Sequence, residues 1–380
     1  MIIKSFSIKD SIQNLQVSDV ELRKLNVLVG TSGAGKTTIM AALNTIKKIA
    51  LGRSSPGDEW SINFIDNYGH DVVWCGRFSD DTDLDSSDNE ISELLEEKII
   101  IDGKVILEKK DDKTIFSDSS LPKIDKYKSN FYILRDNEVL TPLYQSMQSI
   151  IMIHNDSKPH MSEVSTPLLT DKSLKKVSDF FDVNKDASIV DYCDKYNDID
   201  CRSKIFFAKK YDSLKFEDFL FVYTSIFSNV ESILTKEIEA IPRKGSSKVH
   251  HGFQISLKLV DGTIVKQSNI SSGMFKTMML LSDLMFSSKN TVFLIDEIEN
   301  SLGVNCLPDI IQEIKAANFQ CVISTHHPKI INDISPSNWL IVHRDSGVIK
   351  TSKATDIENS SSHHDKFIQL INSCIFRDEK

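Results

Sequence analysis

Residues 25–37 read Leu-Asn-Val-Leu-Val-Gly-Thr-Ser-Gly-Ala-Gly-Lys-Thr, and this stretch predicts the fold of the chain. The nearly continuous apolar run 25–29 is typical of a buried strand. Residues 30–37 match the pattern GxxxxGK[ST] at every fixed position. Strand, glycine-rich turn and helix is the context that a phosphate-binding loop requires, and a helical pattern does follow the turn, at Ile39, Met40, Leu43, Ile46 and Ile49.

Each residue type in this loop has a chemical reason. Glycines let backbone N–H groups close around phosphate oxygens, and the start of the helix adds the positive end of its dipole. Lys36 reaches the β- and γ-phosphates, and Thr37 offers its hydroxyl to Mg²⁺. The sequence therefore predicts ATP and Mg²⁺ as cofactors, with nucleotide contacts from Gly30, Thr31, Ser32, Gly33, Ala34, Gly35, Lys36, Thr37 and Thr38.

Two acidic residues follow a second apolar run, in Thr-Val-Phe-Leu-Ile-Asp-Glu-Ile-Glu at 291–299. At the end of a buried strand, Asp296 would hold the Mg²⁺ and Glu297 would polarise the attacking water. A third apolar run precedes Ser-Thr-His-His-Pro at 324–328. Its position after the acidic strand favours His326 as a contact for the γ-phosphate, since imidazole titrates near pH 7.

A short Ser-Gly segment stands before the acidic strand, at the expected start of a helix. Ser271, Ser272 and Gly273 would form an anion site there and would meet a phosphate supplied from elsewhere. An ordinary helix N-cap is the alternative interpretation of the same residues.

These four elements, in this order, resemble those of the ABC-type ATPases, and more closely the SMC/OLD-like branch of AAA family ATPases. The resemblance implies a head-to-tail dimer in which ATP lies between the phosphate loop of one subunit and residues 271–273 of the other. It implies a D-loop at 300–302 and a switch role for His326, so that Glu297 and His326 form the catalytic pair. It also implies a Mg²⁺-contacting glutamine, with Gln148 as the first candidate and Gln145 as the second.

The predicted fold class is α/β. It is an ABC-type P-loop ATPase head, with a mixed sheet flanked by helices and an antiparallel β subdomain, plus a mainly helical inserted lobe. Short strands and hairpins are expected over 51–130, a long helix over Phe216–Ala240, and a last strand at 339–342. The expected domains are an N-terminal ATPase lobe (1–130), a helical insertion (131–250), a C-terminal ATPase lobe (251–345) and a polar tail (346–380).

The composition restricts the function classes. The net charge of −9 argues against bulk attraction to nucleic acid or to an anionic membrane. No apolar stretch approaches the ~18 residues of a membrane span, and the first residues lack the apolar region of a signal peptide. The six cysteines show no CxxC pair, which is typical of free thiols in a reducing cytoplasm.

We expect a stand-alone ATPase of an anti-phage defence module, similar to the ATPase subunits of the PARIS and Septu systems. In such families the ATPase forms a homodimer or higher homo-oligomer and serves as scaffold and sensor for a separate effector, here expected to be a nuclease. No nuclease domain of its own is expected in this chain. The alternative is an SMC-like repair or recombination ATPase that grips DNA through basic groups at Lys204, 209–210 and 243–248. A transporter ATPase is the poorest match, because the Ser-Gly segment lacks the Gly-Gly-Gln form.

Overall fold

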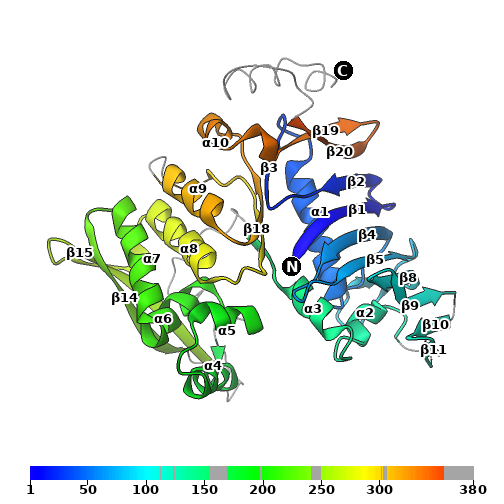
Figure 1. The fold of residues 1–380 in the computed structure, drawn as a ribbon, viewed down its shortest axis with the longest axis horizontal. Coiled ribbons are helices and arrows are strands. Elements are labelled where there is room, and N and C mark those ends of the chain that lie inside the picture. The colour runs from blue at the N-terminus through cyan, green and yellow to red at the C-terminus, as the bar shows by residue number, and fades with distance from the viewer. Residues whose placement is uncertain are drawn as a thin grey trace. The chain divides into compact units, whose positions relative to one another are not determined.

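The computed structural model describes residues 1–111, 113–122, 125–153, 169–196, 199–240, 250–300, 302 and 306–354. The chain divides into two compact units, each of which is assembled from separate stretches of sequence (Figure 1). The first unit contains Met1–Ile153, Asn290–Ile298 and Phe319–Lys380, and the second contains His154–Lys289 and Glu299–Asn318. Among the helices within these described ranges, none has the length and apolar character needed to cross a membrane.

The first unit is built on a mixed sheet of 14 strands among the described residues. Its antiparallel part contains β1 (Ile2–Asp10), β2 (Leu15–Glu21), β4 (Asp58–Ile65), β5 (Asp71–Phe78), β8 (Leu94–Ile101), β9 (Lys104–Lys110), β10 (Lys113–Phe116) and β11 (Ser119–Ser120). The short strands β6 (Asp83–Leu84) and β7 (Glu90–Ile91) form a separate pair.

The other part of the sheet carries the predicted motifs. Strands β3 (Leu25–Val29), β18 (Gln320–Ser324), β17 (Val292–Ile295) and β12 (Ile150–Ile153) lie side by side in this order and run parallel. β19 (Trp339–Asp345) pairs with β3 on its other side and continues through a turn into β20 (Val348–Lys353). Since carboxyl ends of parallel strands meet at one edge, the loops after β3, β17 and β18 share that edge.

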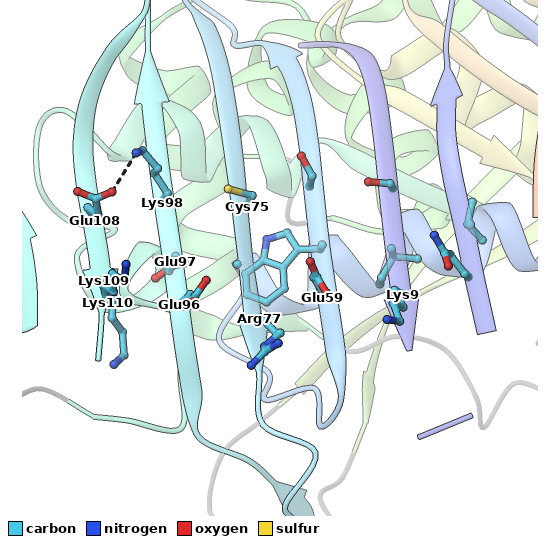
Figure 2. A pocket seen from close by; sticks show the side chains of 17 residues that line it. Lys9, Glu59, Cys75, Arg77, Glu96, Glu97, Lys98, Glu108, Lys109 and Lys110 are labelled. Carbon is cyan, nitrogen blue, oxygen red and sulfur yellow. Dashed lines mark hydrogen bonds and ion pairs between the residues drawn. The ribbon is translucent and has the colours of Figure 1, made fainter. Parts of the chain in front are cut away.

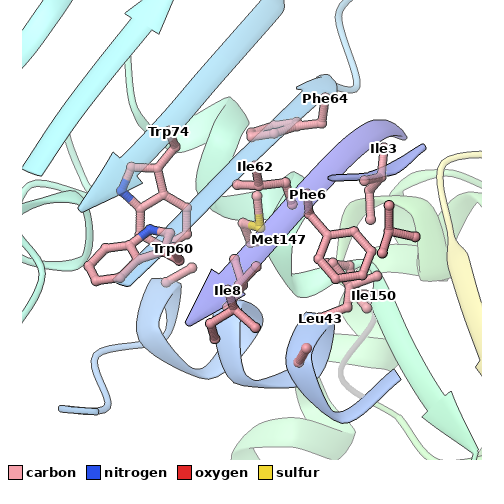
Figure 3. Close-up of a cluster of buried hydrophobic side chains, with 14 of the residues drawn as sticks. Ile3, Phe6, Ile8, Leu43, Trp60, Ile62, Phe64, Trp74, Met147 and Ile150 are labelled. Carbon is pink, nitrogen blue, oxygen red and sulfur yellow. The ribbon is translucent and has the colours of Figure 1, made fainter. Parts of the chain in front are cut away.

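The core of the first unit lies between this sheet and its helices, α1 (Lys36–Ala50), α2 (Asn130–Ile133), α3 (Thr141–Gln148) and α10 (Pro328–Asp333). The five apolar positions that predicted α1 are all buried. Figure 3 shows Phe6 and Ile8 of β1 together with Trp60 and Ile62 of β4 and Leu43 of α1. Apolar alternation along these strands therefore supplies the face that the helix covers.

The second unit combines helices with a small antiparallel sheet. Its helices are α4 (Asp171–Val183), α5 (Ile189–Lys195), α6 (Cys201–Tyr211), α7 (Ser213–Ile226), α8 (Ser272–Phe286) and α9 (Leu307–Ala316). Its strands are β13 (Leu169–Thr170), β14 (Val230–Ala240), β15 (His250–Leu259) and β16 (Ile264–Lys266), and two further 3₁₀ turns in the chain are η2 (Gln267–Asn269) and η3 (Pro336–Asn338). The predicted α/β class, with a large mixed sheet and helical segments, is confirmed.

Three local predictions were wrong. The long helix predicted over Phe216–Ala240 ends at Ile226, and β14 follows it after a turn. β14 pairs with β15 along its whole length, so a distant partner determined its conformation rather than local propensity. Strands β2 and β12 were missed, and the strand at 339–342 is not the last, because the chain turns at Ser346-Gly347 into β20.

Candidate nucleotide-binding site

The loop between β3 and α1 adopts backbone conformations that only glycine takes easily. Gly33 and Gly35 have φ angles of 86° and 107°, in the left-handed region. A Cβ on Gly35 would lie 2.6 Å from Cδ1 of Ile349, and one on Gly30 would lie 2.7 Å from the carbonyl oxygen of Val342. The glycines of the motif are therefore required by the fold of the loop as well as by its ligand.

Lys36 lies inside the loop that precedes it. Its side chain is buried, and Nζ donates hydrogen bonds to the carbonyl oxygens of Gly30 and Thr31, at 2.9 and 2.8 Å. The first turn of α1 carries no acidic residue and no side-chain cap. An ammonium group enclosed by the loop and an uncapped helix N-terminus fit a phosphate group, which gives both of them an anionic partner.

The acidic strand and the phosphate loop meet at the carboxyl edge of the sheet. Oγ1 of Thr37 donates to Oδ1 of Asp296 at 3.2 Å, although the two residues are 259 positions apart. Oδ1 of Asp296 also accepts a hydrogen bond of 2.5 Å from Oγ of Ser324, the last residue of β18. Hydroxyl and carboxylate oxygens are ligands that Mg²⁺ prefers, so Thr37 and Asp296 fit a magnesium site.

Glu297 follows directly and has a φ angle of 45°, which is uncommon for a residue other than glycine. Its backbone N–H donates to Oγ of Ser324 at 2.7 Å. The same serine thus contacts both acidic residues, and sequence reasoning missed it. A buried polar residue at the end of an otherwise apolar strand, Gln320–Ser324, is the signal that could have pointed to it.

The two histidines after β18 have different surroundings. His327 caps α10, because its Nδ1 accepts a hydrogen bond of 3.3 Å from the N–H of Lys329. His326 is exposed and lies two residues beyond Ser324, at the edge where the loops after β3 and β17 also lie. The structure therefore assigns a structural contact to His327 and leaves His326 at the predicted edge.

The predicted magnesium role of Gln148 needs correction. Gln148 ends α3 and precedes β12, whose residues Ile150 and Ile153 pair with Val292 and Ile295 of β17. Gln148 therefore lies at the amino end of these strands and Asp296 at the carboxyl end, about 10 Å apart or more at ~3.3 Å per residue. Gln145, a turn earlier in α3, lies on the same wrong side. The residues that follow β12 at the correct edge are outside the described part of the chain.

The Ser-Gly segment belongs to the second unit. Ser271 is the N-cap of α8, and its Oγ accepts a hydrogen bond of 3.3 Å from the N–H of Met274. Ser271 and Ser272 are exposed. The segment thus makes the N-cap expected of it within its own subunit and keeps exposed hydroxyls at a helix N-terminus. Ser301, in the predicted D-loop, lies outside the described residues.

The basic groups named for DNA binding do not form a basic surface among the described residues. Lys204 is buried, and its Nζ donates to Oδ1 of Asp283 at 2.8 Å and to Oγ of Ser287 at 3.1 Å. Nζ of Lys209 donates to the carbonyl oxygen of Ile233. The basic residues at 243–248 fall outside the described part of the chain.

An open face of the sheet in the first unit has a shallow hollow of about 620 Å³ (Figure 2). One row of residues crosses it in direct cross-strand register: Lys9, Glu59, Arg77, Glu96 and Lys110. Charges of opposite sign alternate along this row. Such a face has no continuous positive strip to follow a phosphate backbone.

Comparisons with known proteins agree with this site. Residues 25–332 match a family model described as "AAA domain, putative AbiEii toxin, Type IV TA system". No curated protein matches the sequence significantly.

Two solved structures share the fold. A crystal structure of an Smc head bound to the C-winged helix domain of ScpA is 13% identical, with a TM-score of 0.50, and the alignment covers 93% of this chain and 98% of that chain. An Smc head domain with an extended coiled coil from Pyrococcus furiosus, bound to the C-terminal domain of ScpA, is 14% identical, with a TM-score of 0.48 and coverage of 98% and 100%. The identities are low enough that the likeness concerns the fold alone. Because the family match runs from the strand before the phosphate loop to the helix after the histidine pair, the chain belongs to the AAA-domain family described as putative AbiEii toxin, type IV TA system.

Proposed function

We propose that this chain binds ATP at the loop 30–37 and hydrolyses it with Glu297 as the general base. The observation that carries the proposal is the contact of Thr37 with Asp296, which joins the phosphate loop to the acidic strand. Membership of a P-loop ATPase family supports ATP as the ligand. When bound by Thr37 and Asp296, Mg²⁺ supplies neutralisation of phosphate charge.

The side chains then have distinct tasks. Lys36 exchanges its two carbonyl partners for phosphate oxygens, so its charge is delivered from inside the loop. Asp296 is held in place through hydrogen bonds from Thr37 and Ser324. Glu297 accepts a proton from the attacking water, and His326 contacts the γ-phosphate from the neighbouring loop.

A second copy of the chain completes the site in this proposal. The exposed N-terminus of α8, with Ser271, Ser272 and Gly273, is directed at the nucleotide of the partner, as in the ABC-type ATPases that the sequence resembles. ATP thereby becomes part of the interface of a homodimer or higher homo-oligomer. The proposed lobes of the head are 1–130 and 251–345, with the insertion at 131–250 and the tail at 346–380.

The biological role that we propose is that of a cytoplasmic scaffold and sensor in anti-phage defence, similar to the PARIS and Septu ATPases. The family description, which refers to a toxin of a type IV toxin–antitoxin system, supports a role of this kind. The effector in this proposal is a separate protein, a nuclease, and its activity is controlled by the ATP state of the dimer.

The enzymatic part is tested with three purified proteins: the parent, Lys36→Ala and Glu297→Gln. We expect the parent to hydrolyse ATP, Lys36→Ala to lose nucleotide binding, and Glu297→Gln to bind ATP and remain a dimer without turnover. Lys48→Ala is the matched control, since Lys48 lies on the same helix and is exposed. Parental turnover in Glu297→Gln would show that the general base is another residue.

The effector is tested by co-expression with the products of the adjacent genes. We expect one of them to co-purify with the parent and to be released or activated when ATP is exchanged for ADP. If none of the neighbouring products binds, alone or together, the scaffold role is wrong while the ATPase assignment is unaffected.

A further inference from the structure

We propose that Ser324 is a positioning residue for ATP hydrolysis and that its hydroxyl orients both Asp296 and Glu297. This inference rests on the proposed function, since it assigns a task within the same site. Ser324 lies at the carboxyl end of β18, between the strand of the phosphate loop and the strand of the two acidic residues.

The geometry gives this hydroxyl two partners of different kinds. It donates its proton to Oδ1 of Asp296 at 2.5 Å and accepts the backbone N–H of Glu297 at 2.7 Å. The carbonyl oxygen of Ser324 accepts the N–H of Ile298 at 3.2 Å. Residues 296–298, which form the turn after β17, are therefore all anchored to this one residue.

The backbone of the turn shows why an anchor is needed. Glu297 has a φ angle of 45°, a left-handed conformation that is unfavourable for a residue with a Cβ. The N–H of Glu297 is donated to the hydroxyl of Ser324 only in this turn, so the hydrogen bond offsets part of the conformational cost. The direction in which Glu297 leaves the sheet thus depends on Ser324.

A second consequence concerns the metal site. Oδ1 of Asp296 accepts hydrogen bonds from both Ser324 and Thr37, so a continuous chain of contacts joins β18 through Asp296 to the start of α1. Ser324 is completely buried, and both functions of its hydroxyl are used within the protein. It acts through its neighbours and does not itself contact the nucleotide.

The test uses a pair of substitutions of equal shape, Ser324→Thr and Ser324→Val, which differ only in the hydroxyl. A hydrogen bond to a charged group is worth a factor of about ten to a hundred. We expect Ser324→Val to turn over ATP at least about tenfold more slowly than Ser324→Thr, with KM changed by less than about threefold. In the Glu297→Gln background the two variants should have the same residual rate, because the base that Ser324 orients has been removed.

A matched pair at Ser149 controls for the loss of a buried hydroxyl as such. Ser149 is also buried and donates to the carbonyl oxygens of Ser146 and Asn290, at the opposite end of the parallel strands. Ser149→Thr and Ser149→Val should turn over ATP equally. Equal rates for the two Ser324 variants, or an undiminished difference between them in the Glu297→Gln background, would overturn the proposal.

A second readout does not depend on turnover. Mg²⁺ should increase the affinity for a fluorescent ATP analogue, and we expect that increase to be at least about threefold smaller in Ser324→Val than in Ser324→Thr, with equal affinities in EDTA. If the parent fails to hydrolyse ATP, the proposed function is wrong, and this measurement still decides the role of Ser324. An identical effect of Mg²⁺ in both variants would then refute it.

Discussion

Asp58→Asn should make the first unit more stable above pH 6. Asp58 is the first residue of β4 and is only 6% exposed. Burial raises the pKa of its carboxyl group to about 6; a hydrogen bond of 2.5 Å from Ser55 opposes the shift, and the negative charge of Asp10, its cross-strand partner, adds to it. An ionised carboxylate is thus unfavourable at this place in the folded protein.

The sign and size of the effect follow from linkage. The pKa rises from an ordinary value of 3.8 to about 6 on folding, so between about pH 4 and pH 6 the folded state holds a proton that the unfolded chain has lost. Stability therefore falls as the pH rises through this window and remains lower above it. A shift of about two pKa units corresponds to about 3 kcal/mol.

The assay is urea unfolding between pH 4 and pH 8, followed by tryptophan fluorescence. The three tryptophans, Trp60, Trp74 and Trp339, all lie in the first unit and report on its unfolding. Asparagine is neutral at every pH and can still accept the hydrogen bond from Ser55. At pH 7.5 we expect Asp58→Asn to exceed the parent in unfolding free energy by about 3 kcal/mol.

The control is Asp136→Asn, because the side chain of Asp136 is 90% exposed and should titrate alike in both states. Its stability should follow that of the parent at every pH. If Asp58→Asn loses as much stability as the parent between pH 4 and pH 6, the reasoning about the buried carboxylate is refuted.

Three further predictions concern the loop, the second unit and the dimer. Gly35→Ala and Gly69→Ala both place a Cβ on a residue with φ near 100°, so each should cost about 1–2 kcal/mol in urea unfolding, but only Gly35→Ala should lose ATP binding by fluorescence titration; binding by both would contradict the assigned loop. Lys204→Met leaves Asp283 without its ion-pair partner and should destabilise the second unit by about 3–5 kcal/mol, measured by circular dichroism, and the further change Asp283→Leu should recover most of it; a silent Lys204→Met would show that the pair contributes little. Ser272→Arg should bind ATP and fail to dimerise with it in light scattering, whereas a loss of binding would place Ser272 at the nucleotide of its own subunit.

The phosphate loop could be predicted from sequence because its requirements are local. Gly33 and Gly35 must adopt positive φ angles, and a short buried strand must precede the loop; both conditions can be recognised within a dozen residues. The strands over 51–130 were predictable for the same reason, since turn residues and apolar alternation are properties of neighbouring positions.

The errors arose where a distant partner decides. β14 is a strand because β15 pairs with it, and its charged residues gave no local sign of this. Gln148 was placed near the metal because β12 went unrecognised, which left the end of the sheet on which Gln148 lies undetermined. Lys204 looked like part of a basic surface until its contact with Asp283 showed it to be buried.

The sequence by itself determined which residues could bind a phosphate, which strand would carry the acids, and that the class of the fold is α/β. Only the tertiary structure decided which of these residues meet: Thr37 with Asp296 across 259 positions, and Ser324 with both acidic residues. The physical reason is that backbone conformation depends on neighbouring residues, whereas the side chains that share an edge depend on the order and direction of strands in the sheet.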